Sequence, residues 1–360
     1  MKIFVVYGTR PEIIKLVPLI LQMQQHPGIQ LVLVNTGQHK EMVEEIEGYF
    51  NIRPDYNLSI MQPNQSLTDI MLNVAAKIEP VLKLEKPDVV LVQGDTSTVA
   101  TVGTVCFYNK IPVGHIEAGL RSNNLEEPYP EEFNRRLISI FAKYNFAPTQ
   151  QSAENLRKEG VSPDRIFVTG NTIVDMVELV KKRFVAEPMP GKKKVLITAH
   201  RRENHGEGIL NICAAVKKMA ADYPELTFVW PVHPNPNVKE VVYRELGSLQ
   251  QLHLSPPMNY LELIRQLNDA YIVWSDSGGI QEECPSFRKP VLILRNVTER
   301  PEVVENGFGE LVGTDVARIV NRSISLLEDE TSYKSMTGGV NPFGDGTASR
   351  QIIDLLLSTR

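Results

Sequence analysis

The sequence predicts an α/β protein built from two doubly wound, Rossmann-like domains. Short β-branched runs alternate with longer segments of helical periodicity along nearly all of the 360 residues, which is typical of parallel sheets covered by helices. The alternation is interrupted around residues 185–194 by prolines, a glycine and a lysine run, which indicates an exposed connection near a domain boundary. The chain length also suits about two domains.

The expected strands are short and apolar, and a helical segment follows each of them. In the first half they lie at Ile3–Tyr7, Leu31–Asn35, Val89–Gln93, Pro112–His115, Asn145–Ala147 and Ile166–Val168. After the connection they lie at Val195–Thr198, Thr227–Trp230, Tyr271–Trp274 and Val291–Leu294. A last helix is expected at Ala348–Leu357, after a turn at residues 342–346. We find no internal repeat.

Composition argues against several functional classes. A net charge of −5 without a Lys/Arg-rich tract argues against nucleic-acid binding. No apolar stretch approaches the ~20 residues that a membrane helix needs, and the apolar start is too short for a signal peptide. We therefore expect a cytoplasmic protein that does not span a membrane. Cys106, Cys213 and Cys284 lack a paired spacing, so we expect them to be reduced core residues.

Carboxylates follow two of the expected strands. Asp95 comes just after residues 89–93, and Glu117 comes just after residues 112–115. Because the carboxyl ends of parallel strands open onto the ligand crevice of α/β proteins, the two acids predict an acid/base pair. Asp95 has an alternative role as the cap of the following helix, whereas no capping pattern surrounds Glu117. Glu131 lies at a proline-led helix start, where capping rules explain it without any function.

Two glycine-containing turns at strand ends are suited to bind a phosphate. The turn at residues 8–12 opens a helix whose free N–H groups attract anions, with Arg10 and Lys15 as nearby cations. The Ser-Gly-Gly turn at residues 275–279 opens another helix, in which Glu283 suits ribose hydroxyls. The alternatives are an N-terminal cap with a surface arginine and a solvated first-turn glutamate. Neither turn matches the dinucleotide fingerprint or the Walker motif.

Histidines end two successive strands of the second half. His200 is followed by Arg201 and Arg202, a group that suits a phosphate or a leaving-group oxygen, and His233 repeats the position on the next strand. A lone histidine there is usually structural, but two successive strand ends favour a function. No metal-ligand spacing and no serine elbow occurs. The residues alone thus predict a two-domain binder of a phosphorylated, nucleotide-linked ligand, with strand ends of both domains lining a cleft and carboxylates for proton transfer.

Taken together in order, the motifs GTRPE, GQH, GDT, HIEAGLR, PEE-NR, TGN, HRREN, PVHPNP, SDSGGIQEE and TERPE resemble the non-hydrolysing UDP-N-acetylglucosamine 2-epimerases over essentially the whole chain. The resemblance implies the GT-B architecture with the active site in the interdomain cleft. It implies a first domain of residues 1–170, joined by a returning helix at about 346–360, and a second domain of residues 171–345. It also implies reversible conversion of UDP-GlcNAc to UDP-ManNAc, for cell-surface polysaccharide, with no cofactor and no metal.

The resemblance further implies roles for individual residues. UDP leaves to give 2-acetamidoglucal and then adds back, with the C2 proton returned to the opposite face by acids among Asp95, Glu117 and Glu131. His200 matches a position that contacts UDP or assists its departure. The nucleotide-binding positions match Arg10, Lys15, Ser277, Gly278, Gly279, Glu283 and Arg300. In the uracil region, Met258 and Leu263 stand where relatives often carry other residues.

Regulation and assembly also follow from the resemblance. Relatives are activated by UDP-GlcNAc at a second site, which Gln38, His39, Gln65, Arg201 and His233 match, and a homodimer is expected. Asn64 and Glu41 replace an arginine and a glutamine of some relatives, which predicts weaker activation. The alternatives are a related epimerase for another UDP-sugar such as a diacetamido-glucuronate, a GT-B glycosyltransferase, and a UDP-sugar-binding regulator without turnover.

Overall fold

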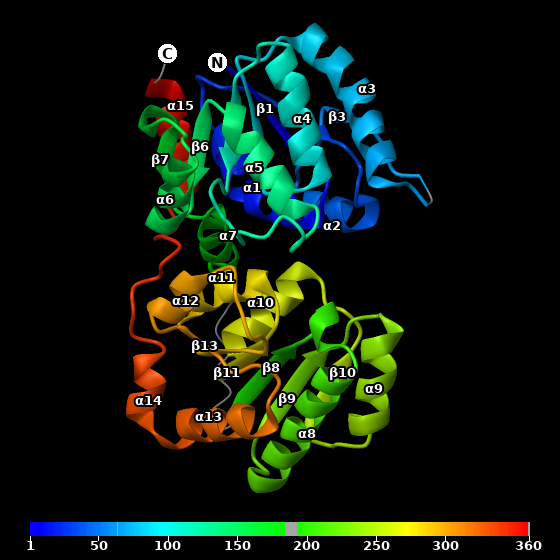
Figure 1. The fold of residues 1–360 in the computed structure, drawn as a ribbon, viewed down its shortest axis with the longest axis vertical. Helices are drawn as coiled ribbons and strands as arrows, with labels where there is room; N and C mark the ends of the chain where they lie inside the picture. Colours follow the sequence, from blue (N-terminus) through cyan, green and yellow to red (C-terminus); the bar gives the residue numbers. More distant parts are fainter. Residues whose placement is uncertain (63, 184–192, 359–360) are drawn as a thin grey trace. The chain divides into compact units, whose positions relative to one another are not determined.

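The structure, a computed structural model, describes residues 1–62, 64–183 and 193–358 and divides into two compact units (Figure 1). Unit 1 comprises Met1–Leu179 and Phe343–Arg360, and unit 2 comprises Val180–Pro342. The resemblance implies a division after residue 170, whereas the contacts divide the chain near the end of helix α7 (Thr172–Lys181). Residues 185–192 of the expected connection lie outside the described residues.

Unit 1 contains a parallel sheet of seven strands in the order β3-β2-β1-β4-β5-β6-β7. Its strands are β1 Lys2–Tyr7, β2 Gln30–Asn35, β3 Tyr56–Asn57, β4 Val89–Gln93, β5 Val113–Ile116, β6 Tyr144–Ala147 and β7 Ile166–Val168. The six expected strands are confirmed, and β3 is an addition at the sheet edge. The chain builds outward from β1 to β3 and then continues on the other side with β4, so the topological switch point lies between β1 and β4.

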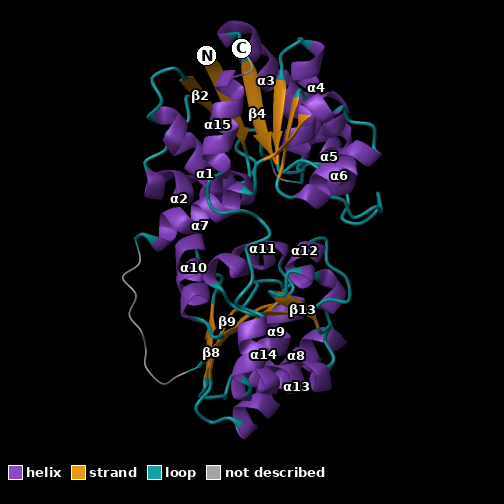
Figure 2. Ribbon diagram, turned by 90° about the vertical axis from the view of Figure 1, so that its left-hand side faces the viewer, coloured by secondary structure: helices purple, strands orange, loops and turns teal. Residues whose placement is uncertain are grey.

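Helices cover both faces of this sheet (Figure 2). They are α1 Arg10–Gln24, α2 Lys40–Phe50, α3 Leu67–Glu85, α4 Ser97–Tyr108, α5 Glu131–Phe141, α6 Gln150–Lys158, the 3-10 turn η1 Pro163–Arg165, α7, and α15 Ala348–Ser358. Helices α3, α4 and α5 share one apolar core with the sheet. On the other side α1 packs against α2 and α15. The strands are buried along most of their length because both faces are covered.

The last helix returns to unit 1, as the resemblance implies. The buried carboxylate of Asp175 in α7 accepts hydrogen bonds from the N–H groups of Ala348, at 3.2 Å, and Ser349, at 2.8 Å. These are donors that the first turn of a helix leaves without an intrahelical partner. Asp175 therefore fixes the start of α15.

Unit 2 contains a second parallel sheet, in the order β10-β9-β8-β11-β12-β13, with its switch point between β8 and β11. Its strands are β8 Lys194–Thr198, β9 Thr227–Pro231, β10 Leu252–Ser255, β11 Ile272–Ser275, β12 Val291–Ile293 and β13 Gly309–Leu311. Its helices are η2 Arg202–Asn204, α8 Glu207–Asp222, α9 Pro236–Leu246, α10 Tyr260–Asp269, α11 Gly278–Phe287, α12 Pro301–Glu305, α13 Val316–Glu328 and α14 Glu330–Ser335. The four expected strands are confirmed, and the outer strands β10 and β13 are additions.

The apolar core of unit 2 surrounds Trp230 and Trp274, which are fully buried. All three cysteines are buried, as expected for core residues. Across the described part of the chain, helices of the length and apolar character needed to cross a membrane are absent.

Candidate active site

Glu117 lies at the carboxyl end of β5, close to the switch point of unit 1. Its backbone adopts φ 70°, a left-handed conformation that is uncommon for a residue other than glycine and is often found at functional sites. Its Oε2 accepts hydrogen bonds from Lys15 Nζ and from Gln93 Nε2, each at 2.5 Å. The side chains of Lys15 and Glu117 are only 11% and 7% exposed. Lys15, expected at a phosphate, therefore forms a nearly buried ion pair with Glu117.

Asp95 is not the cap of α4. The cap is Thr96, whose side chain accepts the N–H of Val99. The carboxylate of Asp95 instead forms an ion pair with Arg135 of α5, and its backbone oxygen accepts Asn134 Nδ2 at 2.9 Å. The capping alternative for Asp95 is therefore wrong, because Thr96 performs that role.

Glu131 and Glu132 begin α5 with different surroundings. Glu132 is fully buried and accepts the N–H groups of Ser122, at 3.0 Å, and Asn123, at 3.3 Å. It also accepts Arg136 Nε at 2.9 Å. Glu131 is half-buried, and its side chain makes no hydrogen bond or ion pair within residues 1–62, 64–183 and 193–358. Glu132, and not Glu131, therefore stabilises the start of α5.

The buried carboxylate of Glu12 joins the turns that follow β1 and β4. Its Oε2 accepts the N–H groups of Gly8, at 2.7 Å, and Thr9, at 2.9 Å, and its Oε1 accepts the Thr96 hydroxyl at 2.5 Å. Burial, with a smaller contribution from the Asp95 charge, raises the pKa of Glu12 from 4.5 to about 7, against the lowering effect of these hydrogen bonds. Glu12 thus holds the turn containing Asp95 next to the start of α1.

Replacing Glu12 with glutamine is expected to remove a pH dependence of stability. A folded-state pKa above the unfolded value means that the folded protein binds more protons between pH 4.5 and about 7, so its unfolding free energy falls as pH rises through that window. A shift of this size corresponds to about 3 kcal/mol. Glutamine can keep the contacts to Gly8, Thr9 and Thr96 without a charge. Urea unfolding at pH 5 and pH 8 should show Glu12→Gln gaining stability relative to wild type at the higher pH, and parallel curves would contradict this.

Asp276 organises the corresponding edge of unit 2. This fully buried residue follows β11, and its Oδ2 accepts the N–H groups of His200 and Arg201, each at 2.8 Å. Asn204 Nδ2 donates to the same oxygen at 2.9 Å. The His200 ring stacks on the His233 ring, with centroids 5.6 Å apart. The structure therefore brings together the two histidines that were predicted from successive strand ends.

Ser277, Gly278 and Gly279 form the start of α11, with Ser277 as its N-cap. The guanidinium of Arg300 lies directly over Gly278, since a Cβ there would be 2.8 Å from Arg300 Cζ. Arg300 Nε also donates to Glu282 Oε1 at 2.8 Å. Glu283 is buried, so its interpretation as a solvated first-turn residue is wrong. A helix start with an arginine beside it is suited to bind a phosphate.

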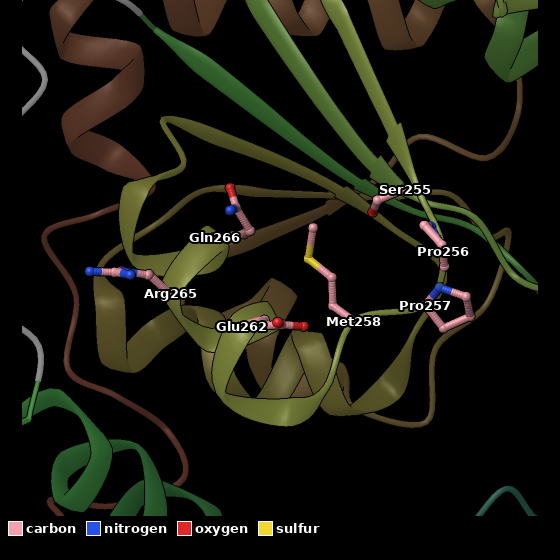
Figure 3. A pocket seen from close by; sticks show the side chains of 7 residues that line it. All are labelled: Ser255, Pro256, Pro257, Met258, Glu262, Arg265 and Gln266. Carbon is pink, nitrogen blue, oxygen red and sulfur yellow. The ribbon is translucent and has the colours of Figure 1, made fainter.

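A pocket lies between the end of β10 and the start of α10 (Figure 3). Met258, from the predicted uracil region, lines it, whereas Leu263 is half-buried in α10 outside it. The full lining is Ser255, Pro256, Pro257, Met258, Glu262, Arg265 and Gln266. Figure 3 shows the Met258 side chain directed inward from the loop.

The residues predicted for a second ligand site divide between the units. In unit 1, Gln38 accepts the Thr98 hydroxyl at 2.8 Å, and His39 N donates to Gly8 O at 2.7 Å. Partial burial lowers the pKa of His39, and the neighbouring Arg10, at the start of α1, lowers it further. The side chain of Gln65 binds its own loop, since its Nε2 donates to Ile60 O at 2.9 Å.

Arg201 and His233 contribute the predicted second-site residues of unit 2. Arg201 lies next to His200, and His233 is exposed beyond β9. In the described residues, no cluster of three or more His, Cys, Asp or Glu side chains is suited to hold a metal ion.

Several organising residues were not predicted from sequence: Glu12, Gln93, Glu132, Arg135, Asp276 and Glu282. Most of them are polar side chains buried at strand ends or helix starts. That combination is the signal that could have identified them, because buried polar groups require partners.

Comparisons with known proteins identify the family of the chain. The family model described as UDP-N-acetylglucosamine 2-epimerase matches residues 21–357. The chain is 46% identical to the UDP-N-acetylglucosamine 2-epimerase of Neisseria meningitidis serogroup A, covering 100% of both chains. It is 44% identical to the enzyme of that name from Escherichia coli K12, covering 100% of this chain and 99% of the relative.

Solved structures lead to the same family. The crystal structure of the Neisseria meningitidis UDP-GlcNAc 2-epimerase bound to UDP-GlcNAc has a TM-score of 0.92 at 45% identity, covering 99% of this chain and 100% of that one. The Methanocaldococcus jannaschii UDP-GlcNAc 2-epimerase in complex with UDP-GlcNAc and UDP has a TM-score of 0.83 at 34% identity, with the same coverage. The predicted GT-B architecture is confirmed by these neighbours and the two parallel sheets. The chain belongs to the UDP-N-acetylglucosamine 2-epimerase family.

Proposed function

We propose that this chain is an isomerase that interconverts UDP-GlcNAc and UDP-ManNAc by inverting C2 of the sugar. The observation that carries the proposal is the set of three carboxylates in unit 1 with three different surroundings. Glu117 is paired with Lys15, Asp95 is paired with Arg135, and Glu131 has no partner among the described residues. Acids in distinct settings are suited to different proton transfers in one reaction.

The chemistry explains why several acids are needed. The proton on C2 is scarcely acidic, because no carbonyl stands beside it. When the C1–O bond breaks, its electron pair leaves with UDP and C1 becomes cationic, so a carboxylate base can then remove the C2 proton. The products are UDP and 2-acetamidoglucal. Return of UDP to C1 and of a proton to the opposite face of C2 completes the inversion without a change in redox state.

Retention of UDP during elimination is the proposed task of the nucleotide-binding residues. The start of α11 supplies backbone N–H groups, and Arg300 supplies a cation held in place by the buried Glu282. We assign UDP to Arg10, Lys15, His200, Met258, Leu263, Ser277, Gly278, Gly279, Glu283 and Arg300. Lys15 is proposed to act through Glu117 as well, since the two side chains form an ion pair.

Solvent exchange at C2 tests the proposed function. We expect UDP-GlcNAc recovered from D₂O after incubation with the pure protein alone to carry deuterium at C2, with slow release of UDP and glycal. A glycosyltransferase would need an acceptor and would exchange no C2 proton. Epimerised product that keeps its original C2 hydrogen would overturn the elimination mechanism.

We further propose that the protein acts as a cytoplasmic homodimer, that its product supplies cell-surface polysaccharide, and that UDP-GlcNAc also serves as an activator. The predicted second site would use Gln38, His39, Gln65, Arg201 and His233. Weaker activation is expected than in relatives with a cation at position 64, because Asn64 carries no charge and Glu41 adds a negative one.

A further inference from the structure

We propose that Asp276 is a positioning residue that holds the proton of His200 on Nδ1 and thereby presents Nε2 of His200 to the ligand. The proposal rests on the proposed function for the identity of that ligand. The assignment of the proton itself follows from the geometry at the ends of β8 and β11.

The carboxylate of Asp276 is fixed by its backbone and by three donors. Asp276 N donates to Thr198 O at 3.0 Å, which ties the residue to the end of β8. Its Oδ2 accepts the N–H groups of His200 and Arg201 and the side-chain amide of Asn204, as described above. Three donors on one oxygen leave the carboxylate little freedom to rotate.

The other carboxylate oxygen has a different environment. Oδ1 of Asp276 is buried without a hydrogen-bond partner of good geometry among the described residues, and His200 Nδ1 lies 3.3 Å from it. A bare Nδ1 would direct a lone pair at this oxygen and leave it unsatisfied, at a cost of about 1–3 kcal/mol. A proton on Nδ1 faces this oxygen with a partial positive charge and lowers that cost. The tautomer with Nδ1–H is therefore favoured, and Nε2 remains to exchange a proton with a bound group.

Four charged or titratable groups surround the His200 ring. Burial lowers the pKa of His200, Asp276 raises it, and Arg201, His233 and His205 lower it. His205 Nε2 also approaches His200 O at 3.3 Å. Asp276 is the one group among these four that favours the protonated imidazole.

The variant Asp276→Asn tests this geometry because asparagine has the same shape as aspartate. Its amide oxygen can take the place of Oδ2 and keep the three donors, which directs the amide NH₂ at His200 Nδ1. The proton is then expected to move to Nε2. Turnover should fall by about 10–100-fold, as when other partners that orient a functional histidine are replaced. In a plot of turnover against pH, the limb that depends on the protonation of His200 should move to lower pH.

Nitrogen-15 NMR of the imidazole tests the assignment directly, with His200→Ala to identify the signals. Wild type is expected to show the Nδ1–H tautomer and Asp276→Asn the Nε2–H tautomer. Wild type with its proton on Nε2 would overturn the proposal, and this measurement needs no substrate. The proposed tautomer can therefore be refuted independently of the C2 exchange experiment.

A double-mutant cycle separates positioning from structure. If Asp276 acts through His200, adding Asp276→Asn to His200→Ala should leave turnover unchanged from that of His200→Ala. A further loss of tenfold or more in that background would mean that Asp276 only supports the loop, and the proposal would be wrong.

Discussion

Replacing Glu131 with glutamine is expected to lower turnover by about 10²–10⁴, or ~3–5 kcal/mol of barrier, without loss of stability. The side chain of Glu131 makes no hydrogen bond or ion pair within the described residues, so its charge can be removed without leaving a partner behind. Steady-state turnover of UDP-GlcNAc and urea unfolding measure the two effects. Affinity for UDP, measured by calorimetry, should stay near that of wild type.

The neighbouring residue offers a matched control. Glu132→Gln removes one charge from the same helix start, but this glutamate is buried and accepts two backbone N–H groups and Arg136. We expect it to lose stability, by about 1–3 kcal/mol, with a smaller effect on turnover. Normal turnover in a folded Glu131→Gln variant would leave that residue only the role of a first-turn acid that favours the helix dipole.

Replacing either of the other two acids, Asp95 or Glu117, should lower turnover to a similar extent but should also destabilise the protein. Asp95→Asn removes one carboxylate beside Arg135, which keeps its ion pair with Glu132 at 3.4 Å, whereas Glu117→Gln removes the carboxylate that pairs with Lys15. Removing one partner of a nearly buried ion pair costs up to about 3–5 kcal/mol, so we expect the larger loss of stability for Glu117→Gln. Turnover should therefore be compared under conditions in which circular dichroism shows each variant to be folded.

Replacing Gly119 with alanine is expected to lower the unfolding free energy by about 3 kcal/mol or more. Gly119 has φ +89°, and an added Cβ would lie 2.2 Å from Ser152 O, which is backbone and cannot rotate away. Helix α6 would have to move from the end of β5. Because Glu117 precedes this glycine by two residues, turnover should fall as well.

Gly160→Ala isolates the conformational part of this effect. Gly160 has a similar φ of +83°, but an added Cβ would meet nothing within 4 Å. Only the left-handed conformation is then penalised, at about 1–2 kcal/mol. Equal losses in the two variants, measured by urea unfolding, would show that contact with Ser152 contributes nothing.

Local sequence patterns predicted the interior strands and the edge strand β7, but not the other three edge strands. The missed strands β3, β10 and β13 are short, and β10 is half-exposed, so none has the long buried β-branched run that identifies an inner strand. The fold class did not depend on them, because the alternation of inner strands and helices already required parallel sheets.

The candidate site was predictable only where a residue's position along a strand fixes its place. Asp95 and Glu117 follow strands, so the rule for strand ends located them. Their partners were not predictable, because Lys15 and Glu117 are 102 residues apart in sequence. The contrast between Glu131 and Glu132 was also hidden, since adjacent identical residues differ only in the helix face they occupy.

The anchoring of α15 by Asp175 has a consequence for the order in which the protein is made. Unit 1 consists of two segments of the chain, and the second of them, starting at Phe343, leaves the ribosome only after unit 2. All of unit 2 is synthesised before α15 can reach α1 and Asp175. Because domains generally fold as units during synthesis, unit 2 has the opportunity to fold while unit 1 still lacks α15. The nascent chain thus completes unit 1 only after it has made unit 2.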